Sequence, residues 1–343
     1  MGKKLTGFMR GVNLGGWLSQ CKPSKEHYDS FITEDDIKTI KSWGLDHVRL
    51  PVDYELVQEK DGTFKEDGFV YIQNAIDWCK NAGLNLILDL HKTIGYSFYE
   101  GAGEKGFFDD KAYQELFYSL WSEFAARYGK YEDMVCFELL NEVTKKEYSP
   151  EWNRIARTCI ERIRKHAPTI RILVGSYWNN HVMAVRDLEP PYDENIVYNF
   201  HCYEPLIFTH QGAHWIPTMD TKFRMPLNVT WKKYAEYTAA NVDQEGDTFA
   251  DCDPNGIPDT SYFENLFADA IKVAEERNVE LYCGEYGVIE NAEPEEAVKW
   301  YKLINAVFEK HSIGRAAWSY KRMNFGIADE RMNGVRETLV KLL

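Results

Sequence analysis

Two stretches, Leu84-Asn-Leu-Ile-Leu-Asp-Leu-His91 and Val135-Cys-Phe-Glu-Leu-Leu-Asn-Glu142, each join a short apolar run to a polar end. Between them, residues 110–128 repeat apolar side chains at helical spacing. An apolar run, a helix and a second apolar run form the unit that places two parallel strands in one sheet. The same alternation extends along almost the whole chain and predicts an α/β protein.

Eight strand-like runs are found in all, with helical patterns between most of them. Eight parallel strands with intervening helices predict a (β/α)8 TIM barrel, and the length of 343 residues suits one such domain spanning 1–343. The strand-like runs are residues 8–14, 47–50, 84–90, 135–140, 172–175, 196–201, 280–284 and 316–320, and the helical patterns are at about 33–43, 67–81, 110–128, 150–166, 262–277 and 293–311.

One connection is far longer than the others. About 60 residues separate the sixth strand-like run from its helix, whereas such loops usually have 2–6 residues. The segment contains Trp215, a helix-like stretch from Trp231 to Ala240 and an acidic, turn-rich end. We therefore expect a subdomain, residues 204–261, inserted between strand six and helix six.

Composition excludes several classes of protein. Lys and Arg total 40 against 54 Asp and Glu, a formal net charge of −14, which disfavours binding to nucleic acid. No apolar stretch is long enough to span a membrane. The seven cysteines never form a Cys-x-x-Cys pair, so we expect buried free thiols. We expect a monomer.

The amino-terminal residues do not show where in the cell the protein acts. Lys3 and Lys4 precede an apolar stretch, but Gly7 and Arg10 interrupt it, so there is no signal-peptide core. An intracellular protein and a secreted one whose leader has been removed both stay open.

Polar side chains gather where the predicted strands end. In a barrel of this kind the active site is built at the carboxyl ends of the strands. A single buried polar residue is usually a satisfied core group, but eight that converge on one mouth indicate a site. They are Arg49, His91, Asn141, Glu142, His201, Tyr203, Glu285 and Trp318.

Glu142 and Glu285 lie on strands four and seven, so they approach from opposite sides of the barrel. Glycoside hydrolysis needs such a pair, one acid to protonate the leaving oxygen and one base or nucleophile at the anomeric carbon. Arg49 would hold one carboxylate ionised, while burial would raise the pKa of the other. Asp53, Asp89 and Glu138 also lie near strands, and we rank them lower, as structural partners.

These residues carry a resemblance to glycoside hydrolase family 5, a family of retaining (β/α)8 glycosidases, and the resemblance covers essentially the whole chain. It implies that Glu142 is the acid/base, Glu285 the nucleophile and Asn141 a donor to the sugar 2-hydroxyl. It also implies that Arg49 and Tyr203 orient the nucleophile, that His201 lies beside the acid/base, and that Trp318 is a stacking floor. The family's site residues are matched in order by Arg49, His91, Asn141, Glu142, His201, Tyr203, Glu285 and Trp318.

Two further segments, Gly11 to Gln20 and Phe208 to Trp215, resemble bacterial endo-β-1,4-glucanases of this family that carry a subdomain after strand six. Where these relatives usually have His-His after strand three, this chain has His91-Lys92. How the chain recognises the sugar on the leaving-group side therefore stays open. The Asn-Leu-Gly-Gly-Trp start also occurs in exo-β-1,3-glucanases of the family, so linkage specificity stays open.

Several tryptophans are candidates for sugar stacking. Trp17 and Trp178 follow strand ends, Trp215 lies in the inserted segment, and Trp318 lies in strand eight. Trp43, Trp78 and Trp121 fall within helical patterns and are expected in the core.

Two motifs suggest other ligands. Gly101 to Gly106 fits G-x-G-x-x-G but lacks the strand-turn-helix context of a dinucleotide site, so we expect a flexible loop beside the cleft. Asp251, Asp253, Asn255 and Asp259 match the start of a calcium loop, yet Tyr262 replaces its bidentate Glu, so a solvated acidic turn is favoured over a Ca²⁺ site. We expect no catalytic metal and no cofactor.

The hypothesis is a retaining endo-β-1,4-glucanase that acts on cellulose-type or mixed-linkage β-glucan. Its alternatives within the family are a β-mannanase, a xyloglucanase and an exo-β-1,3-glucanase. A non-catalytic carbohydrate-binding barrel would not need two opposed carboxylates. A barrel for phosphorylated metabolites would be opposed by the acidic residues after strand seven, Glu290, Glu293, Glu295 and Glu296.

Overall fold

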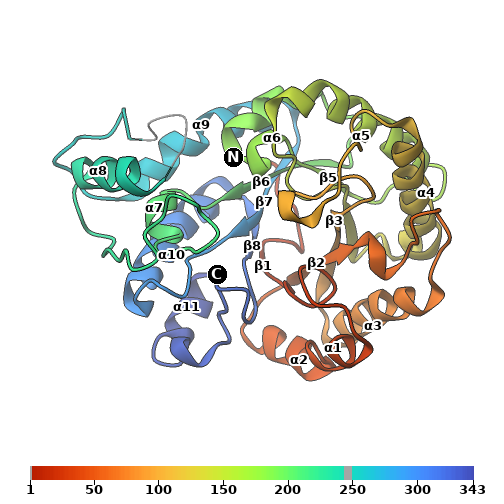
Figure 1. Cartoon of the computed structure of the whole chain (residues 1–343), viewed down its shortest axis with the longest axis horizontal. Coiled ribbons are helices and arrows are strands. Elements are labelled where there is room, and N and C mark those ends of the chain that lie inside the picture. Colours follow the sequence, from red (N-terminus) through yellow and green to blue (C-terminus); the bar gives the residue numbers. More distant parts are fainter. Residues whose placement is uncertain (1, 243–248) are drawn as a thin grey trace.

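The computed structural model describes residues 2–242 and 249–343, and its centre is a closed barrel of eight parallel strands (Figure 1). The strands pair in chain order, and β8 closes the barrel against β1. The predicted (β/α)8 fold is confirmed. The strands are β1 (Arg10–Asn13), β2 (His47–Asp53), β3 (Asn85–Lys92), β4 (Val135–Glu138), β5 (Ile172–Val174), β6 (Ile196–Cys202), β7 (Glu280–Tyr286) and β8 (Gly314–Ala317).

Helices surround the barrel (Figure 1). The six predicted segments between strands form α2 (Glu34–Ser42), α3 (Glu66–Ala82), α4 (Lys111–Tyr128), α5 (Ser149–Ile163), α9 (Thr260–Arg277) and α10 (Pro294–His311). The other helices are α1 (Lys25–Ser30), α6 (Tyr177–Asn180), α7 (Leu206–Thr209), α8 (Trp231–Asn241) and α11 (Arg336–Leu342), and short 3-10 turns cover Tyr54–Leu56, Glu100–Ala102, Gly129–Tyr131, Lys146–Tyr148, Val182–Asp187 and Glu330–Met332.

Several strand boundaries differ from expectation by a few residues, and two of these differences bear on the predicted site. β2 continues to Asp53 because it pairs with β3 that far, so Arg49 lies within the strand and not at its end. β8 ends at Ala317, where its pairing with β7 and β1 stops, so Trp318 follows the strand. Arg49 is therefore set deeper in the barrel than its neighbours, and Trp318 lies at the mouth.

The barrel interior has an apolar layer with a polar layer above it. Ile87, Cys136 and Val197 belong to a buried apolar cluster inside the strands. Side chains alternate along a strand with a period of two, so the next inward positions are Asp89, Glu138 and Asn199. All three are fully buried. The polar layer thus lies between the apolar layer and the mouth.

The segment between β6 and α9 carries α7 and α8. Trp231 of α8 packs on Phe249 and Tyr262, with ring centroids 5.4 and 4.7 Å apart. In Figure 1, α8 lies at the left edge of the molecule, outside the ring of barrel helices. Residues 243–248 of the expected subdomain lie outside the described residues.

Two expectations from composition concern membranes and cysteines. Within residues 2–242 and 249–343, no helix combines the length and apolar character that a bilayer crossing requires. Cys79, Cys136, Cys159, Cys202 and Cys283 are buried free thiols, whereas Cys21 and Cys252 are partly exposed.

Candidate active site

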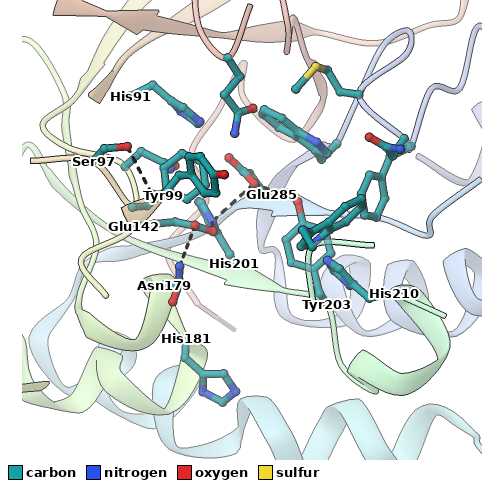
Figure 2. A pocket seen from close by; sticks show the side chains of 18 of the residues that line it. His91, Ser97, Tyr99, Glu142, Asn179, His181, His201, Tyr203, His210 and Glu285 are labelled. Carbon is teal, nitrogen blue, oxygen red and sulfur yellow. Dashed lines mark hydrogen bonds and ion pairs between the residues drawn. The ribbon is translucent and has the colours of Figure 1, made fainter. Parts of the chain in front are cut away.

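A cleft of about 780 Å³ opens at the carboxyl ends of the strands (Figure 2). Its lining includes all but one of the eight residues that the sequence placed at strand ends. The exception, Arg49, is fully buried beneath the cleft. The lining residues from that set are His91, Asn141, Glu142, His201, Tyr203, Glu285 and Trp318.

Glu142 and Glu285 face each other at the centre of this cleft (Figure 2). One carboxylate oxygen of each residue and one ring nitrogen of His201 all lie within 4.8 Å of one another. Both glutamate side chains are largely buried. The two carboxyl groups are therefore close enough to act on one atom between them.

Both oxygens of Glu285 are held by hydrogen bonds. Arg49 Nη1 donates to Oε1 at 2.8 Å, and the Tyr203 hydroxyl donates to Oε2 at 2.9 Å. Arg49 comes from β2 and Tyr203 directly follows β6, so the carboxylate is fixed from two sides. This arrangement orients the Glu285 carboxyl group toward the cleft.

Arg49 is itself held by the polar layer of the barrel. Its guanidinium donates to Glu138 at 2.7 and 2.8 Å and lies 3.0 Å from Asp89 Oδ2. Burial raises the pKa of Asp89 to about 7, and the Arg49 charge opposes that rise. Burial likewise raises the pKa of Glu138, again against Arg49. The Arg49 guanidinium thus forms ion pairs with three buried carboxyl groups, those of Asp89, Glu138 and Glu285.

Glu142 has a different environment. His201 Nδ1 lies 2.9 Å from its Oε1, and the Asn179 amide donates to its Oε2 at 3.0 Å. Burial raises the pKa of Glu142, while the Asn179 hydrogen bond and the charges of His91 and Arg49 oppose the rise. Burial also lowers the pKa of His201 to about 4, so this imidazole is neutral near pH 7. Glu142 is accordingly the carboxyl group suited to keep and deliver a proton.

Besides His201 Nε2, two polar atoms of the residues that line the cleft lack a partner among the described residues. They are Asn141 Nδ2 and His91 Nε2, both buried. The other end of each group is occupied, because Arg49 donates to Asn141 Oδ1 at 2.9 Å and His91 Nδ1 lies 2.6 Å from Asp89 Oδ2. Buried polar atoms are normally hydrogen-bonded, so these two suit the hydroxyl groups of a ligand.

Aromatic side chains supply the rest of the surface. Trp318 stacks on His91, with ring centroids 5.8 Å apart and planes 6° apart. Trp178 and Trp215 line the cleft and are 47% and 40% exposed. Tyr99, 63% exposed, lines it too and was not singled out from the sequence. These exposed rings offer flat apolar faces on which the apolar faces of sugar rings can stack.

Trp17 does not join this set. Its indole is fully buried, donates to the Tyr28 carbonyl at 2.8 Å and stacks on Trp78 at 5.9 Å. It is not among the described residues that line the cleft. The short helix α1, which no pattern predicted, contains Tyr28 and accounts for this burial.

Lys92 also lies in the cleft lining. Its ammonium group pairs with Glu55 and sits 5.6 Å from the Tyr54 ring centroid. Ser97, Phe98 and Tyr99, just before the glycine-rich stretch 101–106, line the same wall. The loop that follows strand three therefore borders the cleft.

Carboxylates of the acidic turn at 251–259 accept hydrogen bonds from backbone groups of nearby residues. Asp253 accepts a hydrogen bond from the Asn255 backbone at 3.1 Å, and Asp259 caps α9 by accepting from the Ser261 backbone at 2.8 Å. Among the described residues, the group of metal-ligating types that gathers within ion-binding reach is Glu142, His201 and Glu285, not the acidic turn.

Known proteins resemble this chain over nearly its full length. The family model described as Cellulase (glycosyl hydrolase family 5) matches residues 8–324. Cellodextrinase A of Ruminococcus flavefaciens is 49% identical over 312 residues, which cover 91% of this chain and 85% of that protein. Endoglucanase C of Acetivibrio thermocellus is 37% identical over 345 residues, covering 99% and 98%. The crystal structure of the cellulose synthase subunit Z from Clostridioides difficile superposes with a TM-score of 0.76 at 28% identity and covers 98% of this chain and 99% of that one.

Proposed function

This chain belongs to the cellulase family, glycosyl hydrolase family 5, and is a glycoside hydrolase; we propose that it is a retaining endo-β-1,4-glucanase with Glu142 as acid/base and Glu285 as nucleophile. One observation carries the assignment of the pair: an oxygen of Glu142 and an oxygen of Glu285 lie within 4.8 Å. Retaining enzymes separate their carboxyl groups by about 5–5.5 Å, whereas inverting enzymes need about 6.5–9.5 Å to admit a water molecule.

In the first step, a Glu285 oxygen attacks the anomeric carbon and the glycosidic C–O bond breaks. Glu142 gives its proton to the departing oxygen and becomes a carboxylate, and a glycosyl ester of Glu285 remains. Arg49 and Tyr203 orient the attacking oxygen through the contacts at 2.8 and 2.9 Å. The unpartnered Asn141 amide would donate to the sugar 2-hydroxyl beside this centre.

In the second step, the Glu142 carboxylate removes a proton from water, and the water oxygen attacks the same carbon. The ester bond to Glu285 breaks, and the sugar leaves with its original configuration. Both carboxyl groups return to their starting states, so water is the second substrate and no cofactor takes part.

The substrate is proposed to be a β-1,4-linked glucan. A polysaccharide substrate follows from the family, and the exposed rings of Tyr99, Trp178 and Trp215 offer stacking positions along the cleft. The name of the Ruminococcus relative adds short cellodextrins to the candidate substrates. A carbohydrate binder without activity is disfavoured because binding alone needs no such carboxylate pair.

We further infer that residues 204–261 act as an inserted subdomain that forms one wall of the cleft. Leu206, His210, Trp215 and Ile216 all come from this segment and line the cleft. Trp215 packs against Phe325 of the loop that follows β8, with ring centroids 6.4 Å apart.

The test is a time course with soluble β-1,4-glucan, mixed-linkage glucan, β-1,3-glucan, glucomannan and xyloglucan. We expect the viscosity of the β-1,4-glucan to fall before much reducing sugar appears, since internal cleavage shortens chains first. Glucose released from the ends of β-1,3-glucan would assign an exo-β-1,3-glucanase. Faster cleavage of mannan or xyloglucan would move the assignment to those activities.

A further inference from the structure

Three consecutive residues after β5 adopt a left-handed backbone. Trp178, Asn179 and Asn180 have φ angles of 52°, 57° and 57°. Asn tolerates this region, but a bulky residue such as Trp is strained in it, and such conformations concentrate at functional sites. The turn therefore needs stabilising contacts around it.

Those contacts are specific. The Asn179 backbone N–H donates to the Val143 carbonyl at 3.0 Å, which ties the turn to the residue after Glu142. The buried Asn180 packs so closely on Gly175 that a Cβ there would lie 2.3 Å from the Asn180 side-chain oxygen. With its own backbone and the neighbouring Asn180 held in this way, the Asn179 amide is directed at Glu142 Oε2, 3.0 Å away (Figure 2).

Glu142 also needs external support. Its φ of 44° is left-handed, and the Tyr96 hydroxyl holds its carbonyl oxygen at 2.6 Å. His201 contacts Oε1, so Asn179 is the partner of the other carboxyl oxygen. An amide nitrogen can only donate, so this bond is stronger to the carboxylate than to the carboxylic acid.

We propose that Asn179 is a positioning residue that orients the acid/base Glu142 and stabilises the negative charge left on it when its proton passes to the leaving oxygen. The inference rests on the proposed role of Glu142. It agrees with the direction in which the Asn179 hydrogen bond acts on the pKa of Glu142, against the rise caused by burial.

The other groups that act on Glu142 electrostatically come from different elements. Among the described residues, the Asn179 side chain hydrogen-bonds only Glu142, so replacing it leaves those groups in place. They are Arg49 on β2, Asp89 and His91 on β3, Tyr96 in the loop after β3, His201 on β6, and Glu285 and Tyr203 at the ends of β7 and β6.

The test compares Asn179→Gly and Asn179→Asp with the parent. Glycine keeps the left-handed backbone and removes only the amide, whereas Asp places a like charge beside Glu142. A matched control is Asn278→Gly, because Asn278 has φ 52° and ψ 46° but precedes β7 at the opposite end of the barrel. The substrates are cellotetraose, whose leaving sugar needs protonation, and 2,4-dinitrophenyl β-cellobioside, whose leaving group does not.

For Asn179→Gly we expect kcat on cellotetraose to fall roughly tenfold with KM nearly unchanged, and activity on the aryl substrate to stay within about twofold. Loss of the hydrogen bond should raise the pKa of Glu142, so the alkaline limb of the pH profile of kcat/KM should shift to higher pH by about one unit. The shift should be larger for Asn179→Asp. Asn278→Gly should match the parent.

An unmoved alkaline limb in both Asn179 variants, or an equal loss on the two substrates, would overturn the inference. Glu142→Gln separates this failure from a failure of the proposed function. If Glu142→Gln retains parental activity and limb on cellotetraose, the acid/base assignment itself is wrong. If Glu142→Gln abolishes activity on cellotetraose while the Asn179 variants behave like the parent, only the inference about Asn179 is wrong.

Discussion

Glu138 accepts two hydrogen bonds from the guanidinium of Arg49, at 2.7 and 2.8 Å, and both side chains are fully buried. The same guanidinium holds Glu285 and Asn141. Asn199 donates to Glu138 at 2.8 Å, so a further strand contributes to the position of this carboxylate. The polar layer of the barrel thereby fixes two groups of the cleft through one cation.

We therefore expect Glu138→Ala to lower the free energy of unfolding by about 3–5 kcal/mol, because it leaves buried donors of Arg49 and Asn199 without their acceptor and opens a cavity in the barrel. Activity should fall as well, since Arg49 loses its anchor. Urea unfolding followed by circular dichroism measures the first effect. The control is Glu337→Ala on α11, whose carboxylate is exposed and should change stability by less than about 0.5 kcal/mol. Equal stability of the Glu138 variant and the parent would contradict this role.

Trp215 is exposed in the cleft and Trp17 is buried in the core, so their replacement should affect different properties, substrate use for Trp215 and stability for Trp17. Trp215→Ala should weaken the use of cello-oligosaccharides roughly tenfold, equivalent to about 1–2 kcal/mol of lost stacking, with the melting temperature preserved. Trp17→Ala should lower the free energy of unfolding by about 3–5 kcal/mol, because it empties a buried site. Kinetics and thermal melts of both variants check this. Parental kinetics for Trp215→Ala on long and short substrates would show that Trp215 only packs.

The sequence predicted the barrel and the residues at its mouth for the same physical reason. Parallel strands all end on one side of a barrel, so His91, Glu142 and Glu285 had to converge once their strands were recognised. The prediction that Arg49 ends its strand was wrong. A polar residue followed by Leu50 and Pro51 resembles a strand end, but the pairing of β2 with β3 continues past Arg49 to Asp53.

Other features had no periodic signal. Asn179 reaches Glu142 only because three residues take a left-handed turn, and neither repeat nor spacing encodes that turn. Tyr99 belongs to a loop whose path depends on tertiary contacts, such as the hydrogen bond from the Gly95 backbone to Glu104 at 2.9 Å. The burial of Trp17 depends on the short polar helix α1, which has no buried residue of its own.

The raised pKa of Glu142 predicts how activity depends on pH. The acid must be protonated to assist departure of the leaving sugar, so kcat/KM on cello-oligosaccharides should fall as pH rises through this pKa. Because burial raises that pKa above the usual carboxyl range, the fall should come at a higher pH than for an exposed glutamate. Because its leaving group needs no proton, a dinitrophenyl cellobioside should show no such limb with the parent, and Glu142→Gln assayed with it should lack the limb too. An unchanged limb in that variant would assign it to another group.

The last prediction concerns the carboxylate pair itself. Glu285→Gln should abolish turnover, because an amide cannot form the glycosyl ester. Glu142→Ala should lose more than about a hundredfold on cello-oligosaccharides but far less in forming the ester from activated aryl cellobiosides, whose leaving groups need little protonation. Azide should restore turnover of the aryl substrate by Glu142→Ala alone and give the β-glycosyl azide, since it needs no deprotonation and enters the space left by the side chain. Proton NMR of the first product of the parent should show the β-anomer. Near-parental activity in either variant, or an α-anomer as first product, would exclude Glu142 and Glu285 as the acid/base and nucleophile of a retaining glycosidase.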